Sequence, residues 1–344
     1  MRVKFWGVRG SIPSPDCAGD DYRWKMERVL KAAEGRAFSN PHELETFFAE
    51  LPGYLLRPVG NNTSCVEVTH GHQRIILDAG SGLRCLGQFL EPNDFSFDEI
   101  DYFIPFEARL KPDLPPPKPR EREPQNLTLL VSHTHWDHIQ GFPFFSPAYV
   151  AGTRLRLYGR DGEQLAWAFD RQQSAPTMFP ISLSGMAADL SFHTFPEEGL
   201  RVGEVEITTM ALPHPGGCQA FRLAAGGRSL VYATDYEFPN IDDAQARRFV
   251  DFISEADVLI SDTQYTYLEG VAREGWGHST SFGAMDLAMR AGIRHFFLFH
   301  HDPEHSDAKL LDNLDKTRAY HQMLSDQGDM RIDLAIEGLA VDLD

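Results

Sequence analysis

Short apolar runs that stop at polar residues recur along the chain. They predict β-strands, because a buried strand presents apolar side chains over about four to eight positions. We expect a first strand and a turn within residues 1–15, and paired strands at 66–70 and 74–82 that are joined at Gly71 and His72. Further strands, each ending at a His or an Asp, are expected at 127–135, 205–214, 229–235, 257–262 and 295–302.

Helical spacing of apolar residues precedes two of these strands. Residues 248–256 and 282–292 each have apolar positions on one helical face, and Gly292 is suited to the position that follows a helix. Strands that alternate with helices indicate an α/β protein built in layers.

Two stretches interrupt this pattern. Residues 16–58 contain helical patterns at 22–33 and 42–51, and a Ser-Asn-Pro helix-start signal precedes the second one. Residues 92–126 contain LPPPKPREREP, which must be extended and solvated. Strands of the same type continue on both sides. We therefore predict one domain, residues 1–344, enlarged by a helical insertion at 16–58 and a Pro-rich surface loop at 92–126.

The charge and the cysteine content narrow the class of protein. The 344 residues include 32 Lys and Arg against 50 Asp and Glu, so the formal charge is −18, which disfavours a surface that binds bare nucleic acid. No apolar run reaches the ~20 residues of a membrane span, and the N-terminus lacks the apolar core of a secretory signal. The cysteines Cys17, Cys65, Cys85 and Cys218 form no CxxC pair, so we expect reduced thiols and a cytoplasmic protein.

The strongest chemical signal is the segment His-Thr-His-Trp-Asp-His at 133–138, directly after an apolar run. Three imidazoles and a carboxylate in six residues are costly to bury without a partner. Alternate residues of an extended segment point the same way, so His133 and His135 can hold one metal ion. Asp137 and His138, on the following turn, can face a neighbouring ion.

Other ligands are expected from the ends of later strands. His214, Asp235 and His300 each close an apolar run, and a carboxylate at 235 can bridge two ions. Asp262 also ends a run, where it is either a support behind the ligands or only a strand end. His300 is favoured over His301 as the ligand, since a slip of one residue reverses the face of a strand.

These residues together resemble the metallo-β-lactamase superfamily of metallohydrolases. The resemblance implies an αββα sandwich with a two-metal site at one edge. It places one metal on His133, His135 and His214. It places the second on Asp137, His138 and His300, with Asp235 between the two. It further implies that Asp78 orients a ligand His, and that His301 faces away, toward supporting or substrate space.

A second motif narrows the resemblance to a branch. The segment GHSTS at 277–281, followed by a helix, Gly292 and a strand ending at His300, is similar to the end of tRNase Z and related cyclic phosphodiesterases. The resemblance implies that His278 faces the scissile phosphate, although a helix cap is the simpler alternative. Asn62, Thr63 and Ser64 match a turn of the same branch, and they either contact the phosphate or ribose of a substrate or only form the turn.

The favoured hypothesis is hydrolysis of a phosphodiester by two divalent ions, with zinc expected first and manganese or iron as alternatives. Asp137 would hold or accept the proton of the attacking water, and His278 would assist the leaving group. The charge favours a small phosphodiester, such as a cyclic nucleotide, over nucleic acid. Because related enzymes are often dimers, the resemblance also implies a homodimer.

Four alternatives remain open at this point. A tRNase Z-like 3′ tRNA endonuclease is one, because the insert at 111–124 carries four Lys and Arg among its prolines and acids. A lactonase or thioesterase of the superfamily would share the 133–138 motif but has no reason to carry the 277–281 segment. A di-iron oxidoreductase would place a Glu where His135 stands. A non-catalytic metal-binding module would have lost ligands, whereas all seven positions are filled.

Overall fold

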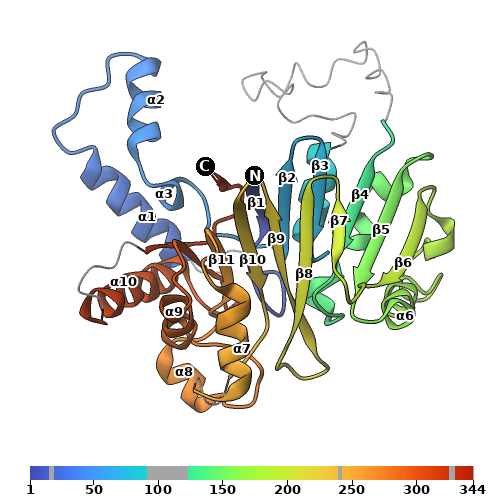
Figure 1. The fold of residues 1–344 in the computed structure, drawn as a ribbon. Helices are drawn as coiled ribbons and strands as arrows, with labels where there is room; N and C mark the ends of the chain where they lie inside the picture. The colour runs from blue at the N-terminus through green and yellow to red at the C-terminus, as the bar shows by residue number, and fades with distance from the viewer. Residues whose placement is uncertain (15–18, 91–122, 239–241, 325–329, 344) are drawn as a thin grey trace, which may run out of the picture.

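The computed structural model describes residues 1–14, 19–90, 123–238, 242–324 and 330–343, and its core is two seven-stranded β-sheets stacked face to face (Figure 1). The first sheet contains, in spatial order, β14 (Ala340–Asp342), β1 (Arg2–Gly7), β2 (Cys65–His70), β3 (Gln73–Leu77), β4 (Asn126–Leu130), β5 (Arg154–Gly159) and β6 (Asp189–Thr194). The second contains β13 (Arg331–Leu334), β12 (His295–Phe299), β11 (Val258–Asp262), β10 (Arg228–Ala233), β9 (Cys218–Ala225), β8 (Val205–Leu212) and β7 (Leu200–Val202).

Helices cover the outer face of each sheet, as Figure 1 shows. The first sheet packs against α4 (Gly82–Leu90) and α6 (Gly162–Gln172), and the second packs against α7 (Ala244–Ile253), α9 (Ser281–Arg290) and α10 (Asp307–Leu324). The short helix α8 (Tyr267–Ala272) precedes α9 in the chain. Helices, sheet, sheet and helices make the four-layer αββα sandwich that the sequence predicts.

The alternation of side chains along β12 shows how one strand serves two layers. Phe296 and Leu298 pack into the core beneath the outer helices, whereas Phe297 and Phe299 pack into the core between the sheets. All four side chains are buried, which explains why this strand reads as a continuous apolar run.

The stretch 16–58, where a helical insertion is predicted, is largely helical in the structure. Its described part contains α1 (Gly19–Ala32), α2 (Pro41–Glu50) and α3 (Gly53–Leu56), and α1 and α2 stand away from the sandwich in Figure 1. The insertion is fixed to the sandwich by a buried ion pair between Lys25 on α1 and Asp307 at the start of α10. Most of the Pro-rich loop predicted at 92–126 lies outside the described residues, and the single-domain assignment stays a prediction.

The strands that carry the candidate ligands end at one edge. The strands β10, β11 and β12 are parallel to one another, and so are β3, β4 and β5. The carboxyl ends of parallel neighbours point the same way, so the polar residues that follow these strands meet at one edge of the sandwich. Within the described part of the chain, no helix is long and apolar enough to cross a membrane.

Candidate metal centre

The segment 133–138 leaves the end of β4 as an extended stretch and then closes into one 3₁₀ turn, Trp136–His138. His133 and His138 are buried, whereas His135 and Trp136 are exposed. The turn thus points Asp137 and His138 inward and leaves His135 at the mouth of the site.

A first group of candidate ligands consists of His133, His135, His214 and Asp235, whose ligand atoms all lie within 4.8 Å of one another. The Nδ1 of His135 lies 3.1 Å from the Nε2 of His214. The Nε2 atoms of His133 and His214 lie 3.6 Å and 3.8 Å from the Oδ2 of Asp235.

A second group consists of Asp137, His138 and His300, also within 4.8 Å of one another. The Nε2 of His300 lies 3.3 Å from the Nε2 of His138 and 3.3 Å from the Oδ2 of Asp137. The Nε2 of His138 lies 3.3 Å from the same carboxylate oxygen.

Asp235 lies between the two groups and faces each with a different oxygen. Its Oδ2 faces the first group, while its Oδ1 lies 3.3 Å from the Nε2 of His138 and 3.2 Å from the Nε2 of His300. One carboxylate therefore offers one oxygen to each of two adjacent positions.

The donor sets fit divalent metal ions. In a tetrahedral zinc site with bonds of about 2.0–2.1 Å, neighbouring ligand atoms lie about 3.3 Å apart, which is close to the separations seen here. The Nε2 of His133 is buried and has no hydrogen-bond partner, so a lone pair is left for an ion. Burial, together with neighbouring imidazoles, lowers the pKa of both His133 and His214, and neutral imidazole is the form that binds metal.

Asp78 fixes the orientation of His138. The Nδ1 of His138 lies 2.7 Å from the Oδ2 of Asp78, and this oxygen also accepts hydrogen bonds from the Tyr232 and Ser132 hydroxyl groups. The Oδ1 of Asp78 accepts the Ser132 backbone N–H. With its Nδ1 held this way, His138 directs its Nε2 at the second group.

His278 forms a pair with Asp262 beside the two groups. The Nδ1 of His278 lies 2.8 Å from the Oδ2 of Asp262 and 3.9 Å from the Oδ2 of Asp235. Burial disfavours the imidazolium, but the Asp262 carboxylate and, more weakly, Asp235 and Asp137 outweigh burial and raise the pKa of His278 to about 9. Asp262, His278, Asp235 and His300 also form a set of ligand atoms within 4.8 Å of one another.

Unusual backbone conformations concentrate at this edge. Of the five non-glycine residues with positive φ in the described ranges, Asp78, Asp235 and His300 directly or closely follow strands β3, β10 and β12. A fourth, Ser11, donates its backbone N–H to the Oδ2 of Asp137 at 2.7 Å. Such conformations cost free energy and persist where the surrounding structure fixes them, which is typical of functional sites.

Comparison with known proteins agrees with this geometry. The profile of the beta-lactamase superfamily domain matches residues 73–301, more than half of the chain. The chain belongs to this superfamily of metallohydrolases. It is 27% identical over 199 residues to the probable metallo-hydrolase YhfI of Bacillus subtilis, covering 54% of this chain and 72% of that protein. It is 26% identical over 239 residues to ribonuclease Z of Halalkalibacterium halodurans, covering 55% and 73%.

Solved structures confirm the fold of the superfamily. The crystal structure of B. subtilis YhfI aligns with a TM-score of 0.57 at 18% identity, over 99% of this chain and 98% of that one. The predicted αββα sandwich, the tRNase Z-like and phosphodiesterase-like branch, and a metal-dependent hydrolase are thus confirmed. The ligand positions and the substrate stay proposals.

The turn at Asn62, Thr63 and Ser64 lies largely out of contact with solvent. Thr63 and Ser64 are buried, and the Thr63 hydroxyl accepts hydrogen bonds from the Ser81 N–H and from the Gln140 amide. Asn62 donates to Glu337 and accepts from the Ser81 hydroxyl. These contacts favour the turn-forming role for Asn62 and Thr63, whose side chains bind the protein itself, whereas the buried Ser64 hydroxyl has no hydrogen-bond partner among the described residues.

His301 lies apart from the ligand groups. Its ring is buried, and its Nε2 lies 3.0 Å from the carbonyl oxygen of Ala335. Its backbone N–H donates to Val8. It does face away from His300, as expected, but it is too buried to contact a substrate, so we leave it out of the proposed site.

The sequence did not point to three contacts that support the site. They are the Tyr232 hydroxyl on Asp78, the Ser11 N–H on Asp137, and the Glu237 carboxylate on the backbone N–H groups of Gly275 and Gly277. The sequence did point to Asp262, because this residue ends a strand. It did not point to its partner His278, which lies sixteen positions further along the chain.

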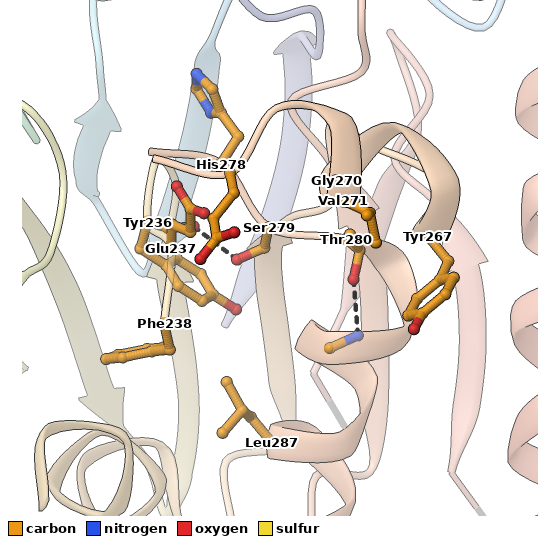
Figure 2. Close-up of a pocket in the computed structure, with 12 residues that line it drawn as sticks. Tyr236, Glu237, Phe238, Tyr267, Gly270, Val271, His278, Ser279, Thr280 and Leu287 are labelled. Carbon is orange, nitrogen blue, oxygen red and sulfur yellow. Dashed lines mark hydrogen bonds between the residues drawn. The ribbon is translucent and has the colours of Figure 1, made fainter. Parts of the chain in front are cut away.

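A cavity of about 330 Å³ lies behind the loop that carries His278, between that loop, α8 and α9. Figure 2 shows Tyr236, Phe238, Thr280 and Leu287 around this space, while the imidazole of His278 points away from it. The cavity is therefore a neighbour of the metal centre and not the centre itself.

Proposed function

We propose that the protein is a two-metal phosphodiesterase that acts on a small nucleotide phosphodiester. The observation that carries the proposal is the position of Asp235, which offers one oxygen to each of two groups of ligands. One metal would be held by His133, His135 and His214. The other would be held by Asp137, His138 and His300, and zinc suits these nitrogen and oxygen donors.

Two divalent ions bound there would polarise the phosphoryl group and make water a stronger nucleophile. In this proposal the Oδ2 of Asp137, which the Ser11 N–H holds, would accept a proton from that water. His278 would donate a proton to the leaving oxygen, since Asp262 holds its Nδ1 and leaves Nε2 for the substrate. Glu237 fixes the loop before His278 through two backbone hydrogen bonds.

A second candidate is RNA cleavage, as the name of the H. halodurans relative describes for that protein. The net charge of −18 opposes a polyanion, which normally meets a basic surface. We therefore favour a small phosphodiester, such as a cyclic nucleotide, and retain a pre-tRNA as the alternative substrate.

The test is a substrate panel on the metal-loaded protein, with elemental analysis of the same sample. The panel contains bis(p-nitrophenyl) phosphate, cyclic mononucleotides, cyclic dinucleotides and pre-tRNA, each at two salt concentrations. We expect hydrolysis of small diesters with a weak dependence on salt. Cleavage of pre-tRNA alone, with a steep loss of activity at high salt, would establish the second candidate instead. Inactivity toward all four would overturn phosphodiester hydrolysis.

A further inference from the structure

Arg160 is a cation at the same edge as the metal centre. It directly follows β5, which is parallel to β4 and pairs with it up to Leu130 and Tyr158. His133 leaves β4 three residues after that pair, and Arg160 leaves β5 two residues after it. The two side chains therefore emerge side by side at the carboxyl ends of adjacent strands.

The guanidinium group of Arg160 has no ion-pair or hydrogen-bond partner among the described residues. Its neighbour Asp161 is engaged elsewhere, because its Oδ1 accepts the backbone N–H groups of Glu163 and Gln164 at the start of α6. An arginine is charged at any pH that the protein tolerates and has five N–H donors. In a chain of net charge −18, an exposed arginine without an acidic partner leaves a local site for an anion.

Two glycines position this guanidinium next to the ligands. A β-carbon built on Gly217 would stand 2.1 Å from the Nη1 of Arg160, so the guanidinium lies directly against the backbone of Gly217 and would have to shift if a larger residue stood there. A β-carbon built on Gly216 would stand 3.8 Å from the Nε2 of His135. Both glycines have positive φ, 83° and 85°, and together they form the floor between the exposed His135 and Arg160.

A small cavity of about 30 Å³ lies beside Arg160. It is lined both by residues of the 133–138 segment and by residues around the guanidinium, including His133, Thr134, Arg160 and the two glycines. An anion bound to Arg160 there would lie beside His133 of the first ligand group. That is the place for a charged group attached to a phosphodiester whose reacting phosphorus lies between the ligand groups.

We propose that Arg160, with the backbone of residues 216 and 217, forms a subsite for a second phosphate of the substrate. The proposal rests on the proposed phosphodiesterase function. It narrows the substrate to a nucleotide diester that carries a further phosphate, such as a linear dinucleotide with a phosphorylated end. A guanidinium group can bind a phosphate through two parallel hydrogen bonds. We therefore expect the preference for such a substrate to appear in the binding affinity.

The test compares the dinucleotides ApA and pApA, which differ only in a terminal phosphate. On the metal-loaded protein we expect kcat/KM to be about 10- to 100-fold higher for pApA, mostly through KM. Arg160→Ala should bring the two values together, and Arg160→Lys should keep part of the difference, because it keeps the charge but loses the fork. Arg248→Ala, an exposed arginine of α7, is the matched control and should change neither value.

A binding measurement separates this proposal from the proposed function. Calorimetry on the metal-loaded His278→Ala variant should show tighter binding of pApA than of ApA, and the double variant with Arg160→Ala should lose the difference. Equal affinities for both dinucleotides in the single variant, or a preference that survives in the double variant, would overturn the subsite. Activity on bis(p-nitrophenyl) phosphate reports on the phosphodiesterase function independently, because that diester has no second phosphate.

Discussion

At the scale of single residues, His278 has two possible roles that metal analysis can separate. It lies within reach of Asp235 and His300 as a further ligand, and it is also paired with Asp262 as an acid would be. We expect His278→Ala to keep the metal content of the wild type and to lower kcat by about 10²- to 10⁴-fold on a nucleotide substrate. Loss of one metal equivalent would instead make His278 a ligand.

The leaving group provides a control for this prediction. p-Nitrophenolate leaves without being protonated, whereas a ribose oxygen needs a proton. The defect of His278→Ala should therefore be much smaller on bis(p-nitrophenyl) phosphate than on a nucleotide diester. An equal fall in kcat on both substrates would contradict protonation of the leaving group by His278. The remaining role of His278 would then be to stabilise charge on the phosphate.

Asp262→Asn tests the support behind His278. An asparagine oxygen can still accept a hydrogen bond from Nδ1, but the negative charge that favours the imidazolium is lost. We expect kcat to fall in the same substrate-dependent way as in His278→Ala, with KM and metal content unchanged. A fall in metal content would show that Asp262 belongs to the ligands.

The seven proposed ligand positions could be chosen from sequence because each follows an apolar run. The choice of His300 over His301 stays a prediction; in the structure His300 lies among the candidate ligands, the chain turns there with φ of 60°, and the His301 ring is buried against Ala335. The partnership of Asp262 and His278 could not be predicted in the same way. It depends on how β11 and the loop before α9 meet in space.

At the scale of elements, the loop before α9 determines where His278 lies. The Glu237 carboxylate accepts the N–H groups of Gly275 and Gly277 at 2.8 Å each, and the Gly277 carbonyl lies 2.8 Å from the Nδ1 of His214. The loop thus contacts His214, a proposed ligand, and carries His278, the proposed general acid. Glu237 helps to fix the position of the loop for both residues.

Glu237→Ala should therefore reduce activity without removing metal. Two N–H groups lose their acceptor, the loop relaxes, and a shift of about 1 Å at His278 can lower kcat by up to about 100-fold. Steady-state kinetics and elemental analysis measure the two effects. Glu274→Ala is the matched control, because this exposed acid nearby has no hydrogen-bond partner among the described residues. Unchanged kcat in Glu237→Ala would show that the loop is fixed by other contacts.

The presence of helices and strands followed from the sequence more closely than their exact ends did. The strand expected at 295–302 corresponds to β12. Its residues from Phe296 to Phe299 point alternately into the core beneath the outer helices and into the core between the sheets. The helix expected at 248–256 begins earlier, at Ala244, because Asp243 caps its first turn by accepting the Ala246 N–H. This first turn has few apolar residues, so periodicity alone could not locate its start.

At the scale of the whole molecule, contacts between distant segments organise the fold. Lys25 and Asp307 are 282 positions apart, and their buried pair joins the helical insertion to α10. The composition of α1 indicated a helix but not its partner, because pairings at this separation are set by the complete topology. The order of elements, in contrast, indicated a layered α/β protein, since alternating strands and helices permit few layered arrangements, and the resemblance to the superfamily implied the αββα sandwich.

Metal binding should stabilise the entire sandwich, because the proposed ligands come from both sheets. His133, His135 and His138 follow β4 of the first sheet, while His214, Asp235 and His300 follow strands of the second. An ion that binds only the folded protein adds about 4 kcal/mol when its free concentration is 1,000 times Kd. We expect chelation to lower Tm by several degrees and added Zn²⁺ to restore it, as measured by calorimetry.

Asp235→Ala should bind less metal and show a smaller shift in Tm, whereas Asp251→Ala, which changes an exposed acid on α7, should behave as the wild type. A Tm that does not respond to metal would contradict a centre that links the two sheets.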